Sequence, residues 1–452
     1  MPKPVTFTPD SLFKFVTAHP EFRRIWIAFS GGMDSHVLLR AFADLKDRLN
    51  DVELQAVHID HGLNEKSEGW SQQCQQVCKS YDIPVKIIRV DARHNKGESP
   101  EAAARHARYD AFKELLKEGD CVVTAHHQDD QAETLLLQLA RGCGPAGLAS
   151  MPMLGRFHSA WLARPLLNFT REQLSVYAQD VNLQWIEDPS NFDIDFDRNF
   201  VRHTVMPAFK QRWPQIVKTI SRSALHNAEV SQLLEQLAEI DLQQLQGEHP
   251  DTLSVSALKA LGEARRNNAI RIWIKKLGLP LPQAVHLKHI NHDILLARKD
   301  AQPAVNWAGC VLSRYRDQLY AMRPLPSHDN NQLYQWDMQR SLTIPNIGTL
   351  STKSVTGSGL RYTKPVDNDA SNSISIRFRQ GGEQCQPSGR AHTHDLKKLF
   401  QEFDVPFWAR DRIPLVYVNN TLAGIVGYCY CQDFVAGANE TGYEIRFQAC
   451  NE

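Results

Sequence analysis

The stretch Ser30-Gly31-Gly32-Met33-Asp34-Ser35 follows the apolar run 25–29 and precedes a helical pattern. The run is short and rich in β-branched and aromatic residues, which predicts a buried strand. After the stretch, the apolar residues Val37, Leu38 and Phe42 recur at helical spacing. The stretch is therefore predicted to be a strand-to-helix turn.

The chemistry of this turn favours binding of an anion. Two adjacent glycines let the backbone approach a ligand closely. Ser30, Ser35 and the first N–H groups of the helix would then form a cradle for phosphate, supported by the helix dipole. Asp34 suits a metal ion on a phosphate better than it suits the phosphate. An ordinary tight turn is the alternative, and Ser-Gly-Gly alone would not exclude it.

The first half of the chain alternates strand and helix patterns. Strands are expected at 52–59, 85–90, 120–125 and 161–163, and helices at 11–17, 67–81, from 99 onward and at 130–141. This alternation predicts an α/β fold with a doubly wound parallel sheet. Ligands bind such sheets beyond the carboxyl ends of the strands. We therefore expect the loops after Phe29, Ile59 and Ala125 to share one cleft.

The pattern changes beyond about residue 213. Helices are expected at 216–245, 254–277 and 286–297, a linker at 324–332, strands at 341–344, 373–378, 415–418 and 422–430, and a helix at 393–403. We predict three domains. These are a catalytic α/β domain at 1–215, a helical domain at 216–325 and a small α+β domain at 326–452.

The amino-acid composition limits the classes of protein to which this chain can belong. The 452 residues contain 51 Lys and Arg and 51 Asp and Glu, so the formal net charge is zero. There is no apolar run of membrane-spanning length and no signal-peptide pattern. The nine cysteines include no Cys-x-x-Cys pair, so we expect neither a zinc knuckle nor a disulfide framework. Reduced thiols and a cytoplasmic location are the expectation.

The charges are unevenly distributed. The segment 198–222 contains six Lys or Arg and no acid, and 264–276 contains five and again no acid. Such blocks in a neutral chain are typical of a face that binds nucleic-acid phosphates. Solvated helix faces explain the charge pattern about equally well.

The segment 124–134 (Thr-Ala-His-His-Gln-Asp-Asp-Gln-Ala-Glu-Thr) ends a predicted strand and starts a helix. Asp130 and Glu133 would share one helix face. Carboxylates at that position suit Mg²⁺, and His127 suits a phosphate or substrate oxygen. Zinc is less favoured because the two histidines are adjacent. A capping box with acids in the first turn is the structural alternative.

Two other segments contain a basic or a glycine-rich pattern. Arg105, on the Ala-rich helix 101–109, is a candidate phosphate clamp because a guanidinium is planar and permanently charged. Surface charge on a good helix former is the alternative reading. The Gly-x-Gly-x-x-Gly of 142–147 follows a helix, not a strand, so it predicts helix termination rather than dinucleotide binding.

Residues 30–35 resemble the pyrophosphate loop, Ser-Gly-Gly-x-Asp-Ser, of ATP pyrophosphatases. Other stretches narrow the resemblance to the tRNA(Ile)-lysidine synthetase family. They are 58–63, 101–109, 126–134, Arg164-Pro165-Leu166-Leu167, 187–191, Arg198-Asn199, Arg202, 379–383, 396–400 and 405–408. The resemblance covers most of the chain and is weakest in the helical middle.

The resemblance implies a reaction and its site residues. ATP, with Mg²⁺, would adenylate the C2 oxygen of the wobble cytidine in the CAU anticodon of tRNA(Ile). Free L-lysine would then displace AMP to give lysidine, which changes codon specificity from AUG to AUA. Asp34 and Asp130 would hold the metal and Arg105 the phosphate charge. Asp60, His127 and Glu133 are candidates for contacts to lysine or nucleotide.

The segment 188–202 would order a loop around the flipped cytidine, although a capped surface loop is almost as good an account of it. Two alternatives to the main reading remain open, namely tRNA cytidine thiolation and a catalytically degenerate tRNA-binding protein. Thiolation needs cysteines near the site, and Cys121 and Cys143 are isolated in sequence. We expect no membrane partner and see no evident protein partner, which leaves a homodimer open.

Overall fold

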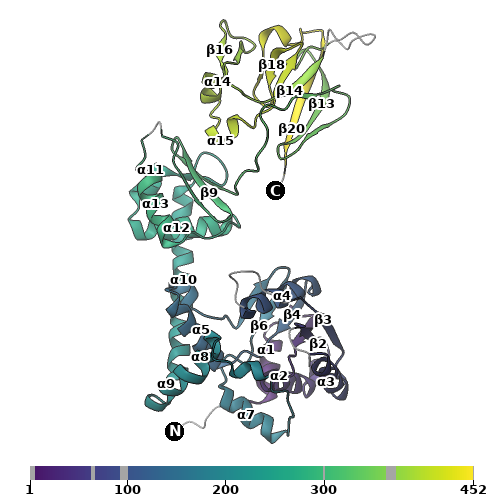
Figure 1. The fold of residues 1–452 in the computed structure, drawn as a ribbon, viewed down its shortest axis with the longest axis vertical. Helices are drawn as coiled ribbons and strands as arrows, with labels where there is room; N and C mark the ends of the chain where they lie inside the picture. Colours follow the sequence, from purple (N-terminus) through teal and green to yellow (C-terminus); the bar gives the residue numbers. More distant parts are fainter. Residues whose placement is uncertain (1–5, 63–66, 92–99, 299–300, 363–372, 451–452) are drawn as a thin grey trace. The chain divides into compact units, whose positions relative to one another are not determined.

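The computed structural model describes residues 6–62, 67–91, 100–298, 301–362 and 373–450. The chain divides into two compact units, 1–234 and 235–452, and each is described on its own (Figure 1). Within the described residues, no helix is both long and apolar enough to cross a membrane.

The first unit is built on a six-stranded sheet. Its strands are β1 (Arg24–Ala28), β2 (Glu53–Asp60), β3 (Val85–Arg89), β4 (Asp120–Val123), β5 (Leu154–Phe157) and β6 (Ala160–Ala163). The order is β3-β2-β1-β4-β6-β5, with every neighbouring pair parallel except β5 and β6. The predicted parallel sheet is confirmed. The antiparallel edge strand β5 was not predicted.

Helices cover both faces of this sheet (Figure 1). They are α1 (Pro9–Thr17), α2 (Met33–Ala43), α3 (Ser67–Ser80) and α7 (Arg171–Asp180) on one face and α4 (Pro100–Leu115) on the other. Two further helices, α5 (Gln128–Ala140) and α6 (Pro145–Leu148), follow β4 in the chain. A short 3₁₀ helix, η1 (Lys46–Arg48), follows α2. The expected start of α4 at residue 99 lies outside the described residues.

Alternation along β1 explains the two layers of helices. Ile25 and Ile27 point into a core shared with α1, α2, α3 and α7. Trp26 points the other way and packs with Phe112 of α4. Successive strand residues face opposite sides of a sheet, so one apolar strand serves both cores. The doubly wound arrangement follows from this pattern.

The rest of the first unit packs against α5. It comprises η2 (Pro189–Phe192), α8 (Asp197–Phe200), the π-helical turn η3 (Val201–Val205), α9 (Met206–Arg212) and the start of α10 (Ile216–Leu245). Val201 and Met206 form a small core with Ala132 and Leu135 of α5. Gly142 has φ +70 just after α5, as expected where glycine ends a helix.

The second unit begins with the last turns of α10 and a mixed domain. Its helices are α11 (Val255–Ala260), α12 (Glu263–Lys276), α13 (Ala284–His289) and the π turn η4 (Ile290–Ile294). These helices were predicted. The antiparallel sheet β7-β10-β9-β8 was not, and it consists of β7 (Leu253–Ser254), β8 (Ala304–Trp307), β9 (Cys310–Tyr315) and β10 (Gln318–Met322). Its buried residues, such as Leu312 and Leu319, complete the core of the helices.

The C-terminal region is α+β, as predicted. One sheet has the order β11-β14-β17-β18-β19 and another β12-β13-β20. The strands are β11 (Tyr334–Gln335), β12 (Leu342–Ile344), β13 (Gly348–Thr356), β14 (Ile374–Arg377), β17 (Leu415–Val418), β18 (Thr421–Ile425), β19 (Cys429–Tyr430) and β20 (Thr441–Ala449). A two-stranded sheet, β15 (Gln384–Cys385) with β16 (His394–Asp395), accompanies α14 (Leu396–Glu402), α15 (Phe407–Arg410) and η6 (Gln432–Phe434).

One expectation about thiols is wrong. Cys385 and Cys431 form a disulfide that links β15 to the residue after β19. These cysteines are 46 residues apart. The spacing of the two cysteines does not predict the disulfide, since only the fold brings the two chain segments together.

Candidate active site

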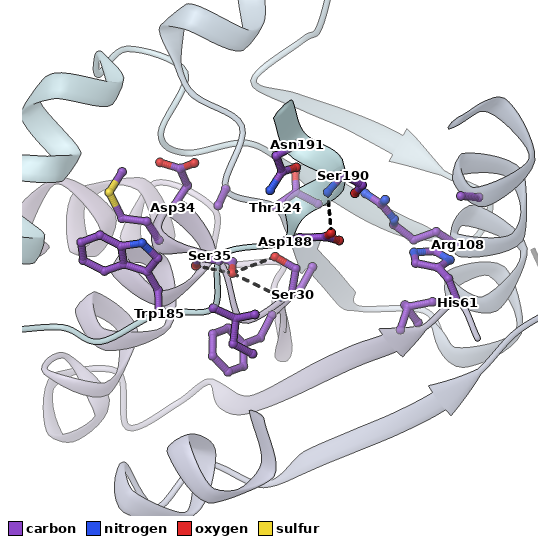
Figure 2. A pocket seen from close by; sticks show the side chains of 18 of the residues that line it. Ser30, Asp34, Ser35, His61, Arg108, Thr124, Trp185, Asp188, Ser190 and Asn191 are labelled. Carbon is purple, nitrogen blue, oxygen red and sulfur yellow. Dashed lines mark hydrogen bonds between the residues drawn. The ribbon is translucent and has the colours of Figure 1, made fainter. Parts of the chain in front are cut away.

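A cavity of about 930 Å³ opens at the carboxyl ends of β1, β2 and β4. Its lining includes Phe29, Ile59 and Ala125, so the three loops expected to share a cleft do share one. The strand order reverses between β1 and β4, the place where parallel sheets bind ligands. The opposite wall is formed by the segment 185–203. Figure 2 shows Asp34 and Trp185 on one side of Ser30 and Ser35, and Arg108 with His61 on the other.

The turn 30–35 has the geometry of an anion cradle. Gly32 is the N-cap of α2 and provides no side-chain cap, so first-turn N–H groups are available to a ligand. The Ser30 amide donates to Ser35 Oγ (3.2 Å), and the two hydroxyl oxygens lie 3.1 Å apart. Ser35 Oγ also donates to the Gly32 carbonyl (2.9 Å). These bonds, drawn in Figure 2, fix the turn before any ligand arrives.

The residue at position 31 has to be glycine for two independent reasons. Its φ of +87 lies in the left-handed region, which favours glycine. Its carbonyl accepts the Ile186 amide (3.0 Å), and a Cβ on Gly31 would lie 2.7 Å from Ile186 Cδ1. The cradle is thereby held to the wall segment that carries Trp185.

Asp34 lies in the first turn of α2 and faces the cavity. Its Oδ2 is 3.6 Å from His127 Nε2 and 3.9 Å from Arg171 Nε. Its Oδ1 is buried and has no hydrogen-bond partner among the described residues. A carboxylate oxygen left open beside an anion cradle fits a hard divalent cation.

Asp130 lies in the first turn of α5, as predicted, and lines the cavity. It forms a reciprocal capping box with His127, whose amide donates to Asp130 Oδ2 (2.9 Å). Its Oδ1 accepts from Arg198 (2.8 Å) and Arg202 (3.0 Å). Burial raises the pKa of Asp130, but the charges of His127 and Arg198 outweigh it and hold that pKa well below its usual range. Both of its oxygens accept hydrogen bonds, and its role as a metal ligand stays a prediction.

Glu133 is buried and takes part in the same charge cluster. Arg202 donates to both of its oxygens, through Nε (2.8 Å) and Nη2 (2.9 Å). Arg198 Nε donates to Oε2 (3.1 Å). Asp130, Glu133, Arg198 and Arg202, here called the charge cluster, therefore tie α5 to α8 and η3. The two arginines line the cavity, whereas Glu133 lies behind them.

The histidines near the site differ in the direction in which their pKa values are shifted. Burial lowers the pKa of His127, but Asp130 and Asp34 raise it more, so the net shift is upward. Burial lowers the pKa of His126 to about 3, and its Nδ1 lies 2.8 Å from Thr124 Oγ1. Burial and the charge of Arg108 lower the pKa of His61 to about 4. The cavity wall therefore presents neutral imidazoles from His126 and His61.

Arg105 does not line the cavity. Its guanidinium lies over the Tyr109 ring (4.8 Å to the centroid) and donates to the Tyr109 hydroxyl (3.3 Å). Arg108, on the neighbouring helix face, lines the cavity instead. Asp60 also lines it and accepts the Gly62 amide (3.0 Å). His127 is buried beneath the lining.

Other lining residues were missed from the sequence or named only as part of a motif. They are Trp185, Arg171, Asn191, Phe192, Phe196, Asn199 and His203. Asp188 caps η2 by accepting the Ser190 amide (2.9 Å), as Figure 2 shows. The sequence of 187–191 predicts this turn, because Asp188 followed by Pro189 is a typical capping pattern. Nothing in the sequence indicated which of its neighbours face the cavity.

Within the described residues, no group of three His, Cys, Asp or Glu side chains is arranged to hold a metal ion by itself. The lining of the cavity in the described part of the chain also contains no cysteine.

Comparisons with known proteins agree with this architecture. Three family models match, a PP-loop domain at residues 8–209, a TilS substrate binding domain at 253–320 and a TilS substrate C-terminal domain at 374–447. Among solved structures, the chain is similar to the U34-tRNA thiolase NcsA from Methanococcus maripaludis, with a TM-score of 0.39 and 16% identity over 46% of this chain and 72% of that one.

Curated relatives cover nearly the whole chain. The tRNA(Ile)-lysidine synthase of Coxiella burnetii is 43% identical over 443 residues, which are 98% of this chain and 97% of the relative. That of Methylococcus capsulatus is 39% identical over 92% of this chain and 93% of the relative. With the phosphate cradle intact and all three domains present in order, the chain belongs to the tRNA(Ile)-lysidine synthase family.

Proposed function

We propose that this protein uses ATP to join free L-lysine to C2 of the wobble cytidine in the CAU anticodon of tRNA(Ile). The observation that carries the proposal is the anion cradle of 30–35, which opens into a cavity of about 930 Å³ walled by 185–203. That volume is near the upper end for small-molecule sites, which leaves room for a nucleotide and a second ligand together. Similarity to lysidine synthases over nearly the full length supports the choice of substrate.

The first step is adenylation of the cytidine. The C2 oxygen attacks the α-phosphorus of ATP, an O–P bond forms, and pyrophosphate leaves. Residues 30–35 bind the pyrophosphate portion through backbone N–H groups and the Ser30 and Ser35 hydroxyls. Arg108 and Arg171, which line the cavity, balance the charge that develops on the phosphates. This assignment moves the clamp role from Arg105 to Arg108.

Mg²⁺ belongs to the proposal through one residue. Asp34 has the open carboxylate oxygen, and Mg²⁺ in nucleotide sites uses one or two carboxylates together with phosphates and water. When bound, the ion would neutralise phosphate charge and favour departure of pyrophosphate. Asp130 stays a predicted second ligand, although its oxygens already accept hydrogen bonds from the charge cluster and the His127 amide.

The second step replaces the activated oxygen. A neutral amine of lysine attacks C2, a C–N bond forms, and AMP leaves with the former C2 oxygen. The attacking nitrogen releases one proton to solvent. The acceptor base enters between Asn191, Asn199 and the aromatic residues of the wall. Asp130 and Glu133 act by positioning Arg198 and Arg202 against that entry. Asp60, whose side chain lines the cavity, is the remaining candidate for holding the lysine ammonium.

The regions 216–325 and 326–452 are proposed to bind the body of the tRNA. Their support is the match to TilS substrate-binding models and the basic helix α12, which carries Arg265, Arg266, Arg271, Lys275 and Lys276. Several of these cations also pair with acids of α10, such as Lys275 with Glu235. Their role is thus both structural and electrostatic.

One assay tests the function. Protein, ATP, Mg²⁺ and radiolabelled lysine are incubated with tRNA(Ile) carrying CAU, and with the same tRNA carrying a uridine at the wobble position. We expect label in the first tRNA only, with one AMP formed per lysine joined. ATP turnover to AMP without lysine in the tRNA would overturn the ligase proposal. Label in both RNAs would overturn the cytidine requirement.

A further inference from the structure

Aromatic side chains gather at the rim of the cavity on the segment 192–200. Phe192 is 65% exposed and Phe200 is 46% exposed, and Phe192 and Phe196 both line the cavity. Scattered exposed apolar residues are ordinary on protein surfaces. Three phenylalanines lie within nine residues beside this cavity. An exposed apolar patch of this kind is typical of an interaction site.

Phe192 is held firmly although it is exposed. Its ring stacks on His203, with centroids 5.6 Å apart and planes 29° apart. His203 Nε2 lies 2.8 Å from the Asn191 carbonyl oxygen. Asn199 Nδ2 donates to the carbonyls of Ser190 and Asp193, each at 2.9 Å. The turn that carries Phe192 is therefore fixed at three backbone oxygens to α8 and η3.

Phe192 is flanked by the exposed acids Asp193, Asp195 and Asp197, and a basic stretch follows them in the sequence. The stretch 198–222 has no acid, and its Arg212, Lys218 and Arg222 are exposed. Trp213, in the same stretch, is 55% exposed. Aromatic faces interleaved with cations are the chemistry by which proteins bind single-stranded nucleic acid, because bases stack on the rings while cations contact phosphates.

A base that enters the cavity leaves the stack of its neighbours. Extrusion loses stacking energy, and one face of the neighbouring base is left without a partner. A fixed aromatic ring at the rim offers that face a new partner at little entropic cost, since the ring is already ordered. We propose that Phe192, backed by His203, is the stacking subsite for the nucleobase next to the reacting cytidine. This proposal rests on the proposed function, because the cytidine in the cavity defines the neighbour.

The test measures binding of full-length tRNA(Ile) carrying CAU to the full chain, at several salt concentrations. Two further RNAs lack the base on the 5′ or the 3′ side of the cytidine. The variants are Phe192→Ala, Phe192→Trp and the control Leu139→Ala, a residue of α5 that is 57% exposed and lies outside the lining. Because Phe192 is exposed, all variants should keep the wild-type unfolding midpoint, which is checked first.

We expect Phe192→Ala to weaken binding of the intact tRNA about tenfold, within the range for one base on one ring. The slope of log K against log salt should not change, since no charge is removed. Phe192→Trp should bind like wild type, and Leu139→Ala should have no effect. On one of the two abasic RNAs, Phe192→Ala should cost less than about twofold, because the stacking partner is already missing.

Each other outcome has a defined meaning. An equal loss on the intact and both abasic RNAs would overturn the stacking subsite and assign Phe192 to another contact. Unchanged affinity of Phe192→Ala, with wild type binding and modifying the tRNA, would overturn the subsite while the proposed function stands. Failure of wild type to bind the tRNA would overturn both.

Discussion

The guanidinium of Arg202 donates two hydrogen bonds to the Glu133 carboxylate, one from Nε to Oε1 (2.8 Å) and one from Nη2 to Oε2 (2.9 Å). This planar, two-point contact is one that a lysine cannot make. Arg198 and Asp130 complete the cluster, so that α5 and η3 are joined by charges with little access to water. The η3 turn is π-helical, and such turns often occur at functional sites.

Replacing Glu133 should therefore destabilise the first unit. Glu133→Gln removes a buried charge and leaves two guanidinium groups short of a partner, a loss of about 3 kcal/mol in the free energy of unfolding. The exposed pair of Glu53 with Arg24 provides the control, and Glu53→Gln should cost less than about 1 kcal/mol. Denaturant unfolding followed by fluorescence measures both. Equal losses would mean that the cluster has no special role in stability.

The sequence predicts only part of this charge cluster. The segment 124–134 indicated that Asp130 and Glu133 share a helix face, which the structure bears out. It could not indicate that Arg202, 69 residues further on, would neutralise both. Metal binding and ion pairing need the same acidic residue types, and only the tertiary fold decides between them.

Local patterns were more reliable than long-range ones. The parallel strands and their loops followed from apolar runs, because burial on both faces of the sheet leaves a strong signal. The sheet β7-β10-β9-β8 was missed because its strands are only two to six residues long, and the choice of Arg105 over Arg108 depended on helix rotation. Residue spacing alone predicts neither the pairing of such short strands nor the rotation of a helix about its axis.

Gly31→Ala should disable the ATP site. The added Cβ meets Ile186 Cδ1 at 2.7 Å, and the left-handed backbone costs a non-glycine residue about 1 kcal/mol more. We expect ATP affinity to fall about tenfold or more. Gly31→Ala combined with Ile186→Val, which removes Cδ1, should recover only part of the loss, because the backbone strain remains. Calorimetric titration with ATP measures this, and full recovery would show that strain is unimportant.

His126 should remain neutral throughout the physiological range. Its pKa is about 3 in the folded protein, against about 6.5 for an unperturbed imidazole. A lowered pKa of a base means that the unfolded chain takes up a proton first, so stability falls as the pH drops from about 6.5 toward 3. NMR of labelled histidine, assigned with His126→Gln, should detect no protonation of His126 above pH 5. A midpoint near 6.5 would contradict the burial argument.

Asp34→Ala should stop adenylation without lowering the affinity for tRNA. The open Oδ1 of Asp34 is the proposed contact to Mg²⁺, so release of pyrophosphate should slow at least about a hundredfold. Affinity for tRNA should change less than about twofold, since Asp34 bears no positive charge for phosphate. Asp34→Asn should respond to added Mg²⁺ at higher concentrations than wild type does. Loss of tRNA binding in either variant would refute the metal assignment.

The two arginines of α4 give a paired test of the clamp. Arg108 lines the cavity, whereas Arg105 lies on the ring of Tyr109 outside it. Arg108→Gln should lower the rate of adenylation about a hundredfold, which is the usual effect of removing one donor from developing charge. Arg105→Gln, an equal loss of charge on the same helix, should lower it less than about threefold. The single-turnover release of pyrophosphate separates chemistry from binding in both variants. The reverse order of effects would return the clamp to Arg105 and would mean that α4 rotates when ATP binds.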